Sequence, residues 1–114
     1  MSGWLVLPLS GEQSLPEATR LRERLLELIG DTTLRVIILD LAAVTFIDST
    51  TIGVIIGARK RLSTQGRHLW LAAPNEAVHR TLTVIALDKL MPVYMTLAEA
   101  ETAVAENGVS HQLD

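Results

Sequence analysis

The eight residues Leu34–Leu41, LRVIILDL, constrain the fold of this chain more than any other stretch. Six of them are apolar, and three of those six are β-branched. A strand with one solvent-facing side alternates apolar and polar residues, whereas a nearly continuous apolar run indicates a strand covered on both faces. Because such strands occur mainly in parallel sheets flanked by helices, this stretch predicts the centre of an α/β fold.

Strand and helix patterns alternate on either side of this run. Further strands are expected at Gly3–Leu9, His68–Ala72 and Pro92–Met95. Helices are expected at about 14–29, 49–66, 75–86 and 96–106, the first and last opened by capping boxes. Short connections with right-handed crossovers then predict a four-stranded, mostly parallel sheet packed with about four helices. We therefore predict one α/β domain over residues 1–106, followed by a polar tail at 107–114.

The composition excludes several classes of function. The 114 residues include no Cys, which rules out disulfides, thiol catalysis and Cys-based zinc sites. The formal net charge is -3 and the few basic residues alternate with Leu, so no nucleic-acid partner is expected. No apolar run reaches the roughly 18 residues that cross a membrane, and the N-terminus lacks a secretion signal. We therefore expect a soluble, cytoplasmic protein with no membrane partner.

Catalytic and metal sites are also not expected. The histidines are His68, His79 and His111. None of them has a second His or a carboxylate at the spacing that gathers metal ligands on one helix face. The chain has no G-x-S-x-G elbow and no P-loop, so we expect no enzyme activity and no cofactor. One alternative stays open, in which Asp40, Asp48 and Ser49 line a pocket for a small ligand; it predicts a concave cleft.

Residues 46–57, FIDSTTIGVIIG, place an aspartate and three hydroxyls where a strand should hand over to a helix. A Ser, Thr or Asp at this position usually caps the helix by accepting a free backbone N–H of the first turn. Capping needs only one such residue, whereas four stand in a row at 48–51. The surplus hydroxyls indicate a role beyond capping.

The helix predicted to begin near Ser49 has an unusual outer face. Its core face should hold Ile52, Ile55, Ile56 and Leu62. The opposite face should hold Thr50, Gly53, Val54, Gly57 and Arg61. Two exposed glycines lower helix stability by about 1 kcal/mol each relative to Ala, so small residues here need another reason. We interpret this face as a docking surface for a partner protein; the alternative is a second buried face.

Asp40-Leu41 and Phe46–Val54 together resemble the signature region of the STAS domain family, in particular the bacterial anti-sigma-factor antagonists. The family pattern is an apolar strand that ends in D-L, followed after a few residues by φ-D-S-[ST]-G-φ-G-φ, where φ is apolar. The resemblance continues through the strand HLWLAA and the helix after Pro74-Asn75 to the last strand and helix. It covers nearly the whole chain and implies the STAS fold with a regulatory, non-enzymatic role.

The resemblance also implies a phosphorylation switch at Ser49. In the antagonists, the Ser directly after the Asp is phosphorylated by a serine/threonine kinase that is itself the anti-sigma factor. The unphosphorylated antagonist binds this anti-sigma factor and frees the sigma factor; phosphorylation breaks the complex, and a phosphatase restores it. Together with the small-residue face of the helix, this places partner contacts at Asp48, Thr50, Thr51, Gly53, Val54, Gly57 and Glu12.

The chain departs from the family pattern at two places. Thr51 stands where the family has Gly, and Gly11-Glu12-Gln13-Ser14 replaces the family's G-E-[LI]-D turn, which lies beside the phosphorylation site. These departures keep a second interpretation open, in which the chain is a STAS scaffold subunit of a stress-signalling complex. The exposed face leaves the oligomeric state open as a monomer or a weak homodimer.

Overall fold

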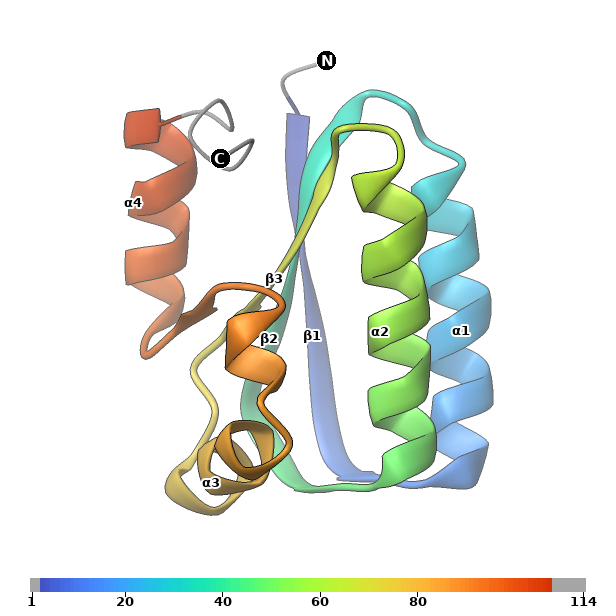
Figure 1. The fold of residues 1–114 in the computed structure, drawn as a ribbon, viewed down its shortest axis with the longest axis vertical. Helices are drawn as coiled ribbons and strands as arrows, with labels where there is room; N and C mark the ends of the chain where they lie inside the picture. Colours follow the sequence, from blue (N-terminus) through green and yellow to red (C-terminus); the bar gives the residue numbers. More distant parts are fainter. Residues whose placement is uncertain (1–2, 108–114) are drawn as a thin grey trace.

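The computed structural model describes residues 3–107 and shows a sheet with helices on both faces (Figure 1). The strands lie in the order β1-β2-β3-β4, and every neighbouring pair is parallel. The strands are β1 (Gly3–Gln13), β2 (Leu34–Ile47), β3 (His68–Ala72) and β4 (Val93–Tyr94). The helices are α1 (Leu15–Ile29), α2 (Ser49–Ser63), α3 (Glu76–Val84) and α4 (Leu97–Asn107), with a short 3-10 helix η1 (Leu87–Lys89). The predicted α/β fold with a four-stranded parallel sheet is confirmed.

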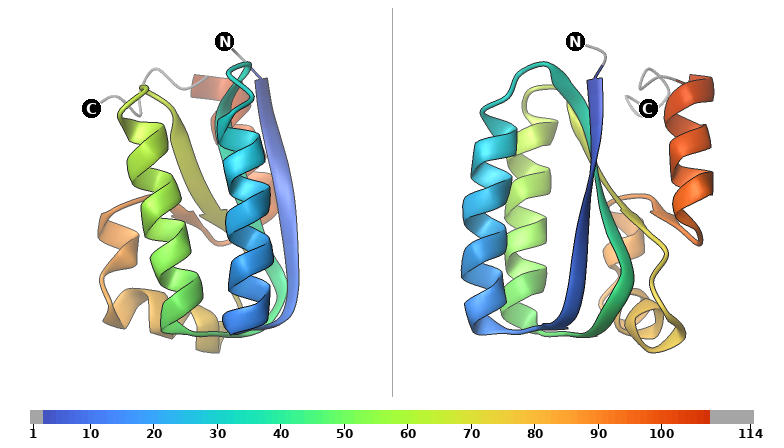
Figure 2. Two further views of the ribbon diagram at one scale, coloured as in Figure 1. Left: turned by 90° about the vertical axis from the view of Figure 1, so that its right-hand side faces the viewer. Right: turned by 180° about the vertical axis from the view of Figure 1, so that it is seen from behind.

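Side chains of β2 alternate between the two faces of the sheet, because successive residues of a strand point to opposite sides. Ile37 and Leu39 belong to the larger core, which α1, α2 and α3 cover, while Val36 and Ile38 belong to a smaller core beneath α4. Figure 2 shows α4 on the side of the sheet opposite to α1 and α2. All four side chains have 0% exposure, which confirms that this strand is covered on both faces.

Strand β1 is longer than the predicted Gly3–Leu9, and the expected end at Ser10-Gly11 is wrong. The register between β1 and β2 shifts on both sides of this dipeptide, and the φ of Gly11 is +72°. A left-handed φ suits glycine, so an irregularity within the strand replaces the expected turn. Pairing then resumes as far as Gln13, which lies opposite Ile47. Both long strands thus reach the point from which α2 starts.

Three helices begin close to where the capping patterns place them, while α2, which ends at Ser63 and not at 66, and α3 both end early. At the start of α1, the N–H and the hydroxyl of Ser14 both donate to Glu17 Oε1, at 3.3 and 2.9 Å. Helix α3 ends at Val84, short of the predicted Ala86. Ala86 has a left-handed φ of 61°, which breaks the helix, and the chain continues as η1.

The helices of this chain are short. The longest, α1 and α2, have 15 residues each. Across residues 3–107, none combines the length and the apolar character that crossing a bilayer requires. The predicted tail at 107–114 lies outside the described residues apart from Asn107, which ends α4.

Arg67, between α2 and β3, binds the end of α1 and the start of β2 from a position that is only 1% exposed. Its guanidinium donates at 2.8 Å to the backbone oxygens of Ile29, Asp31 and Leu34, with a longer contact of 3.4 Å to Leu28. The last carbonyls of a helix lack partners within the helix and carry partial negative charge. They therefore stabilise a buried guanidinium that forms no ion pair with a carboxylate of residues 3–107, and Arg67 fixes the end of α1 against the sheet.

Candidate functional site

The start of α2 lies at the end of the sheet where β1 and β2 finish, near the start of α1 (Figure 1). Asp48 caps this helix: its Oδ1 accepts the N–H of Thr51 at 3.0 Å and the hydroxyl of Thr50 at 2.6 Å. These bonds, the one from the Thr50 hydroxyl first, hold the pKa of Asp48 below its ordinary value. The predicted cap is confirmed, and it is a charged carboxylate at neutral pH.

The three consecutive hydroxyls have three different environments. Thr50 is exposed and donates to Asp48. Thr51 is completely buried, and its hydroxyl donates to the backbone oxygen of Gln13 at 3.1 Å. Ser49 is exposed, and its hydroxyl makes no hydrogen bond to any residue in the described range 3–107. Of the three, Ser49 alone presents a hydroxyl that the fold does not use.

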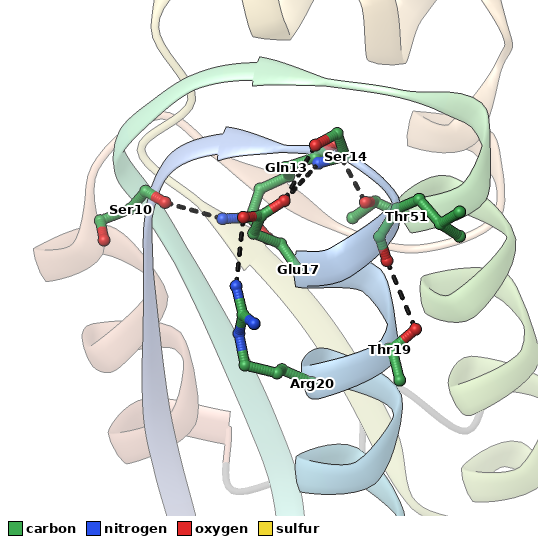
Figure 3. A network of polar contacts seen from close by, with 8 residues as sticks. Ser10, Gln13, Ser14, Glu17, Thr19, Arg20 and Thr51 are labelled. Carbon is green, nitrogen blue, oxygen red and sulfur yellow. Dashed lines mark hydrogen bonds and ion pairs between the residues drawn. The ribbon is translucent and has the colours of Figure 1, made fainter.

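The backbone oxygen of Gln13 ties the end of β1 to the start of α2. Besides the Thr51 hydroxyl, it accepts the N–H of Asp48 at 3.0 Å. The Gln13 side chain is itself buried, and its Nε2 donates to the backbone oxygen of Ser10 at 2.8 Å (Figure 3). Asp48, directly before Ser49, and Thr51, two residues after it, are therefore both anchored to β1.

The expected partner contact at Thr51 is corrected by this burial. A side chain with 0% exposure does not reach a partner surface. The atoms that Thr51 adds where the family has Gly are used inside the molecule, in the bond to Gln13. This bond joins residues 38 apart in the sequence, so no local pattern could indicate it.

The outer face of α2 partly matches the prediction. Gly53 and Gly57 are exposed, and a Cβ placed on either would meet no atom within 4 Å, so neither lies on a second buried face. Val54 is half-buried and packs against the larger core. Ile56, predicted to face the core, is 38% exposed instead. The fully buried side of α2 consists of Thr51, Ile55, Ala58 and Leu62, which displaces it by about one residue from the predicted side.

Glu12 lies at the same end of the sheet but not on the face of α2. It is exposed in β1, opposite Phe46 in the register with β2. Phe46 is 52% exposed and precedes Ser49 by three residues, so the single Phe of the chain stands on the surface near the site. The sequence prediction missed Phe46 because it counted this residue among the apolar residues of a strand.

The geometry does not support the alternative of a small-ligand pocket. Asp40 accepts the N–H of Ala42 at 3.0 Å, and Asp48 caps α2, so each carboxylate stabilises its own turn. The hollow that Ser49 lines is formed by residues of α1 and α2 and includes neither aspartate. The polar groups that the alternative requires do not converge.

Neither of the two histidines within residues 3–107 belongs to a cluster that could hold a metal ion. Within residues 3–107, no group of three or more His, Asp or Glu side chains could hold an ion. His68 is the first residue of β3, and His79 lies in α3. His111 lies outside the described residues.

The motif around Ser49 and the order of the elements agree with one protein family. The family model described as the STAS domain matches residues 2–100, which is most of the chain. This chain belongs to the STAS domain family. The resemblance at Asp40-Leu41 and Phe46–Val54 is confirmed, and the STAS fold supplies the frame in which Ser49 opens α2.

Known STAS relatives include proteins named for sigma-factor regulation. An anti-sigma F factor antagonist from Paenibacillus polymyxa is 34% identical over 92 residues, which cover 81% of this chain and 79% of that protein. A candidate anti-sigma factor antagonist from Thermotoga maritima is 41% identical over 64 residues, or 56% of this chain. That match spans 57% of the Thermotoga protein, little more than half of its length.

Solved structures share the fold of this STAS domain. The crystal structure of an anti-sigma factor antagonist from Mycobacterium paratuberculosis matches it with a TM-score of 0.81 at 27% identity. The match covers 90% of this chain and 86% of that chain. Most of this chain therefore has a counterpart in that structure.

Proposed function

We propose that this STAS domain is an anti-sigma-factor antagonist switched by phosphorylation of Ser49. Unphosphorylated, it binds an anti-sigma factor that is also a serine/threonine kinase, and so frees a sigma factor in the cytoplasm. Phosphorylation by that kinase releases the domain, and a phosphatase restores the binding form. The observation that carries the proposal is the exposed Ser49 hydroxyl, which no hydrogen bond to a residue from 3 to 107 occupies.

A phosphate at Ser49 suits a switch that leaves the fold intact. It adds a charge of about -1.5 to -2 at neutral pH. The first turn of a helix carries free N–H groups and a positive partial charge, which tolerate an anion there. Because the Ser49 hydroxyl makes no hydrogen bond to any described residue, its modification breaks none. The change is therefore confined to the surface that a partner meets.

The proposed partner surface lies around Ser49. It comprises Asp48, Thr50, Gly53, Val54, Gly57 and Glu12 from the sequence prediction, with Phe46 added and Thr51 removed because it is buried. Phosphate beside the ionised Asp48 places two negative groups together, which repels an acidic or apolar partner surface. The domain acts by binding alone, so the proposal includes no catalytic residue and no cofactor.

The test is to incubate the purified domain with the anti-sigma kinase encoded in the same genome and with ATP. We expect one phosphate on the wild type, located at Ser49 by mass spectrometry, and none on Ser49→Ala. The matched control is Thr50→Ala, which removes the neighbouring exposed hydroxyl and should still accept the phosphate. In calorimetry, Ser49→Asp should bind the kinase about tenfold or more weakly than the wild type and Ser49→Ala.

Three other results would contradict all or part of the proposed function. Equal binding of the wild type, Ser49→Ala and Ser49→Asp would contradict the switch and favour the scaffold subunit of a stress-signalling complex. Phosphate transfer to Thr50 instead of Ser49 would keep a switch but contradict the assigned residue. Binding to no anti-sigma factor of that genome would contradict the antagonist function itself.

A further inference from the structure

Helices α1 and α2 run side by side in the same direction (Figure 2). Two hollows lie between them, one of about 430 Å³ beside Ser49 and one of about 320 Å³ further along α2. Both are lined by Arg22, Gly53 and Val54, so the two hollows adjoin each other along the helices. We call the two hollows together the interhelical groove and define it by Leu15, Arg22, Leu26, Gly53, Val54, Gly57 and Arg61.

The interhelical groove is lined by apolar side chains on the side of α1 and has free space on the side of α2. Leu15 and Leu26, which are 63% and 43% exposed, both line the hollows from the side of α1. On the side of α2, nothing lies within 4 Å of a Cβ placed on Gly53 or Gly57. The packing of this domain therefore does not require glycine at either position, although glycine weakens a helix relative to Ala. The open space is room for an occupant.

The rim of the interhelical groove carries positive charge only. Arg22 and Arg61 line it, and no acidic residue lines either hollow, although the chain has a net charge of -3. Neither arginine side chain makes an ion pair or hydrogen bond within the described residues 3–107. Other exposed arginines, such as Arg20 and Arg24, pair with a glutamate 3.1 Å away on their own helix. Two unpaired cations on an apolar groove complement a partner that is both apolar and acidic.

We propose that the interhelical groove binds an acidic amphipathic helix of a partner protein. The apolar face of that helix would rest on Leu15 and Leu26, and its backbone would approach over Gly53 and Gly57, where no side chain intervenes. Its Asp or Glu side chains would reach the two rim arginines, and carboxylates bind guanidinium groups with two parallel hydrogen bonds.

A second copy of this chain is a poorer occupant. A symmetric contact through the groove would bring Arg22 and Arg61 of one molecule against the same arginines of the other. Like charges brought together at an interface disfavour the complex. The charge of the groove thus selects a different, acidic protein.

The link to phosphorylation rests on the proposed function. Ser49 and Arg22 line the same hollow, so a phosphate on Ser49 would add negative charge close to an arginine that the acidic helix needs. It would repel the carboxylates of the helix and compete with them for Arg22. A modification at the first residue of α2 would in this way weaken binding along the whole groove.

The first experiment uses two synthetic amphipathic helical peptides that share one Leu/Ala face. One peptide carries Glu on its polar face, and the other carries Lys at the same positions. In NMR titrations of the isotope-labelled domain, we expect the Glu peptide to shift the amide signals of Gly53 and Gly57 and the Lys peptide to leave them unchanged. Absence of shifts with the Glu peptide, or equal shifts with both peptides, would overturn the proposal.

Variants then locate the binding. Arg22→Glu and Arg61→Glu should each lower the affinity of the domain for the Glu peptide about tenfold. The controls Arg24→Glu and Lys60→Glu make the same charge change on the same helices but outside the groove, and should have less than about a threefold effect. Gly57→Leu should block binding by filling the groove, without lowering the melting temperature. If the control variants weaken binding as much as the groove variants, the effect is general charge attraction, and the proposal is wrong.

The outcomes separate this inference from the proposed function. If the rim variants lose the Glu peptide while Ser49→Asp keeps both peptide and anti-sigma kinase, the groove stands and the switch at Ser49 fails. If Ser49→Asp loses the kinase while the rim variants bind kinase and peptide like the wild type, the switch stands and the groove fails. Loss of the peptide in both sets of variants would support the competition for Arg22.

Discussion

The two ends of the α1–α2 layer satisfy their free backbone groups in opposite ways. A helix leaves N–H groups unpaired at its start and carbonyl oxygens unpaired at its end. At the end near Ser49, the Asp48 carboxylate accepts the free N–H of Thr51, while the Thr51 hydroxyl donates to the backbone oxygen of Gln13 in β1. At the opposite end, the buried side chain of Arg67 binds backbone oxygens at the end of α1, in the turn after it and at the start of β2.

The residue that stabilises one end of this layer and the residue available for modification at the other end are therefore different in kind. Arg67 is buried with its donors directed at backbone oxygens, so it cannot change without loss to the fold. Near Ser49 the bonding is divided among several residues, and one hydroxyl is left over. A helix end that is held by several side chains can present a residue for modification, whereas an end that is held by one buried side chain cannot.

The largest effect should come from Arg67→Ala. Its loss takes a charged donor from each of the backbone oxygens of Ile29, Asp31 and Leu34, of which Asp31 still accepts the Leu34 N–H, so the free energy of unfolding should fall by about 3 kcal/mol or more. Urea unfolding followed by circular dichroism measures this change. Lys60→Ala, an exposed control at the same end of α2, should stay within about 0.5 kcal/mol of the wild type. A loss of less than about 1 kcal/mol for Arg67→Ala would remove the contrast between the two ends.

A smaller loss is expected for Thr51→Val. Val has nearly the same shape but cannot donate to the backbone oxygen of Gln13, so the free energy of unfolding should fall by about 1 kcal/mol. The oxygen keeps its second bond from the Asp48 N–H, which limits the loss. Urea unfolding at neutral pH is again the measurement. An unchanged stability would mean that the bond to β1 does not hold the start of α2.

The Asp48 carboxylate at the start of α2 should make the stability of the domain depend on pH. The pKa of Asp48 is lowered in the folded state, first by the Thr50 hydroxyl and then by the Thr51 N–H. Its contribution to stability is therefore complete above the ordinary value for Asp, about 4, and is lost as the pH falls through the lowered pKa. The stability difference between wild type and Asp48→Asn should accordingly vanish in strong acid.

NMR of the side-chain carboxyl carbons checks the cause of this shift. Thr50→Val should raise the pKa of Asp48 toward its ordinary value, because it removes the bond with the largest effect. The control Thr45→Val changes an exposed Thr in β2 and should leave this pKa in place. If the pKa of Asp48 is the same in Thr50→Val as in the wild type, the hydrogen bond from the Thr50 hydroxyl to Asp48 is not formed in solution.

The smallest effect is expected for Ser49→Ala. Because the hydroxyl makes no bond to any residue from 3 to 107, the free energy of unfolding should stay within about 0.5 kcal/mol of the wild type. The same urea series measures it beside Thr51→Val, two residues further along the helix. A loss as large as that of Thr51→Val would show that Ser49 has a structural task and would weaken its role as the modified residue.

The strong local signals of the sequence predicted most of the elements. The apolar run 34–41 predicted a strand buried on both faces, because its residues leave no polar side to face water. The pattern S-x-x-E at Ser14 placed the start of α1, and the Asp-Ser-Thr-Thr run placed the start of α2. These signals succeed because caps and strand burial depend on residues that are close together in the chain.

Contacts between distant residues decided the rest. The packing of α2 and its flanking loops against β1 and α1 decides that Thr51 is buried and Ile56 is exposed. It also decides that Arg67 binds the end of α1. Helical periodicity gives the spacing of a buried face but not its rotation toward a neighbouring helix, which packing sets.

By itself, the sequence determined the alternation of strands and helices, the family, and the position of Ser49 at a helix start. Only the tertiary structure decided which of the three hydroxyls is free, because that depends on bonds to Gln13 across the fold. It also decided where two arginines that form no ion pair within residues 3–107 meet an apolar groove, since Arg22 and Arg61 come from different helices. The physical reason is the same in both cases: local sequence sets what a segment can form, and packing between distant segments sets which side chains remain for a partner.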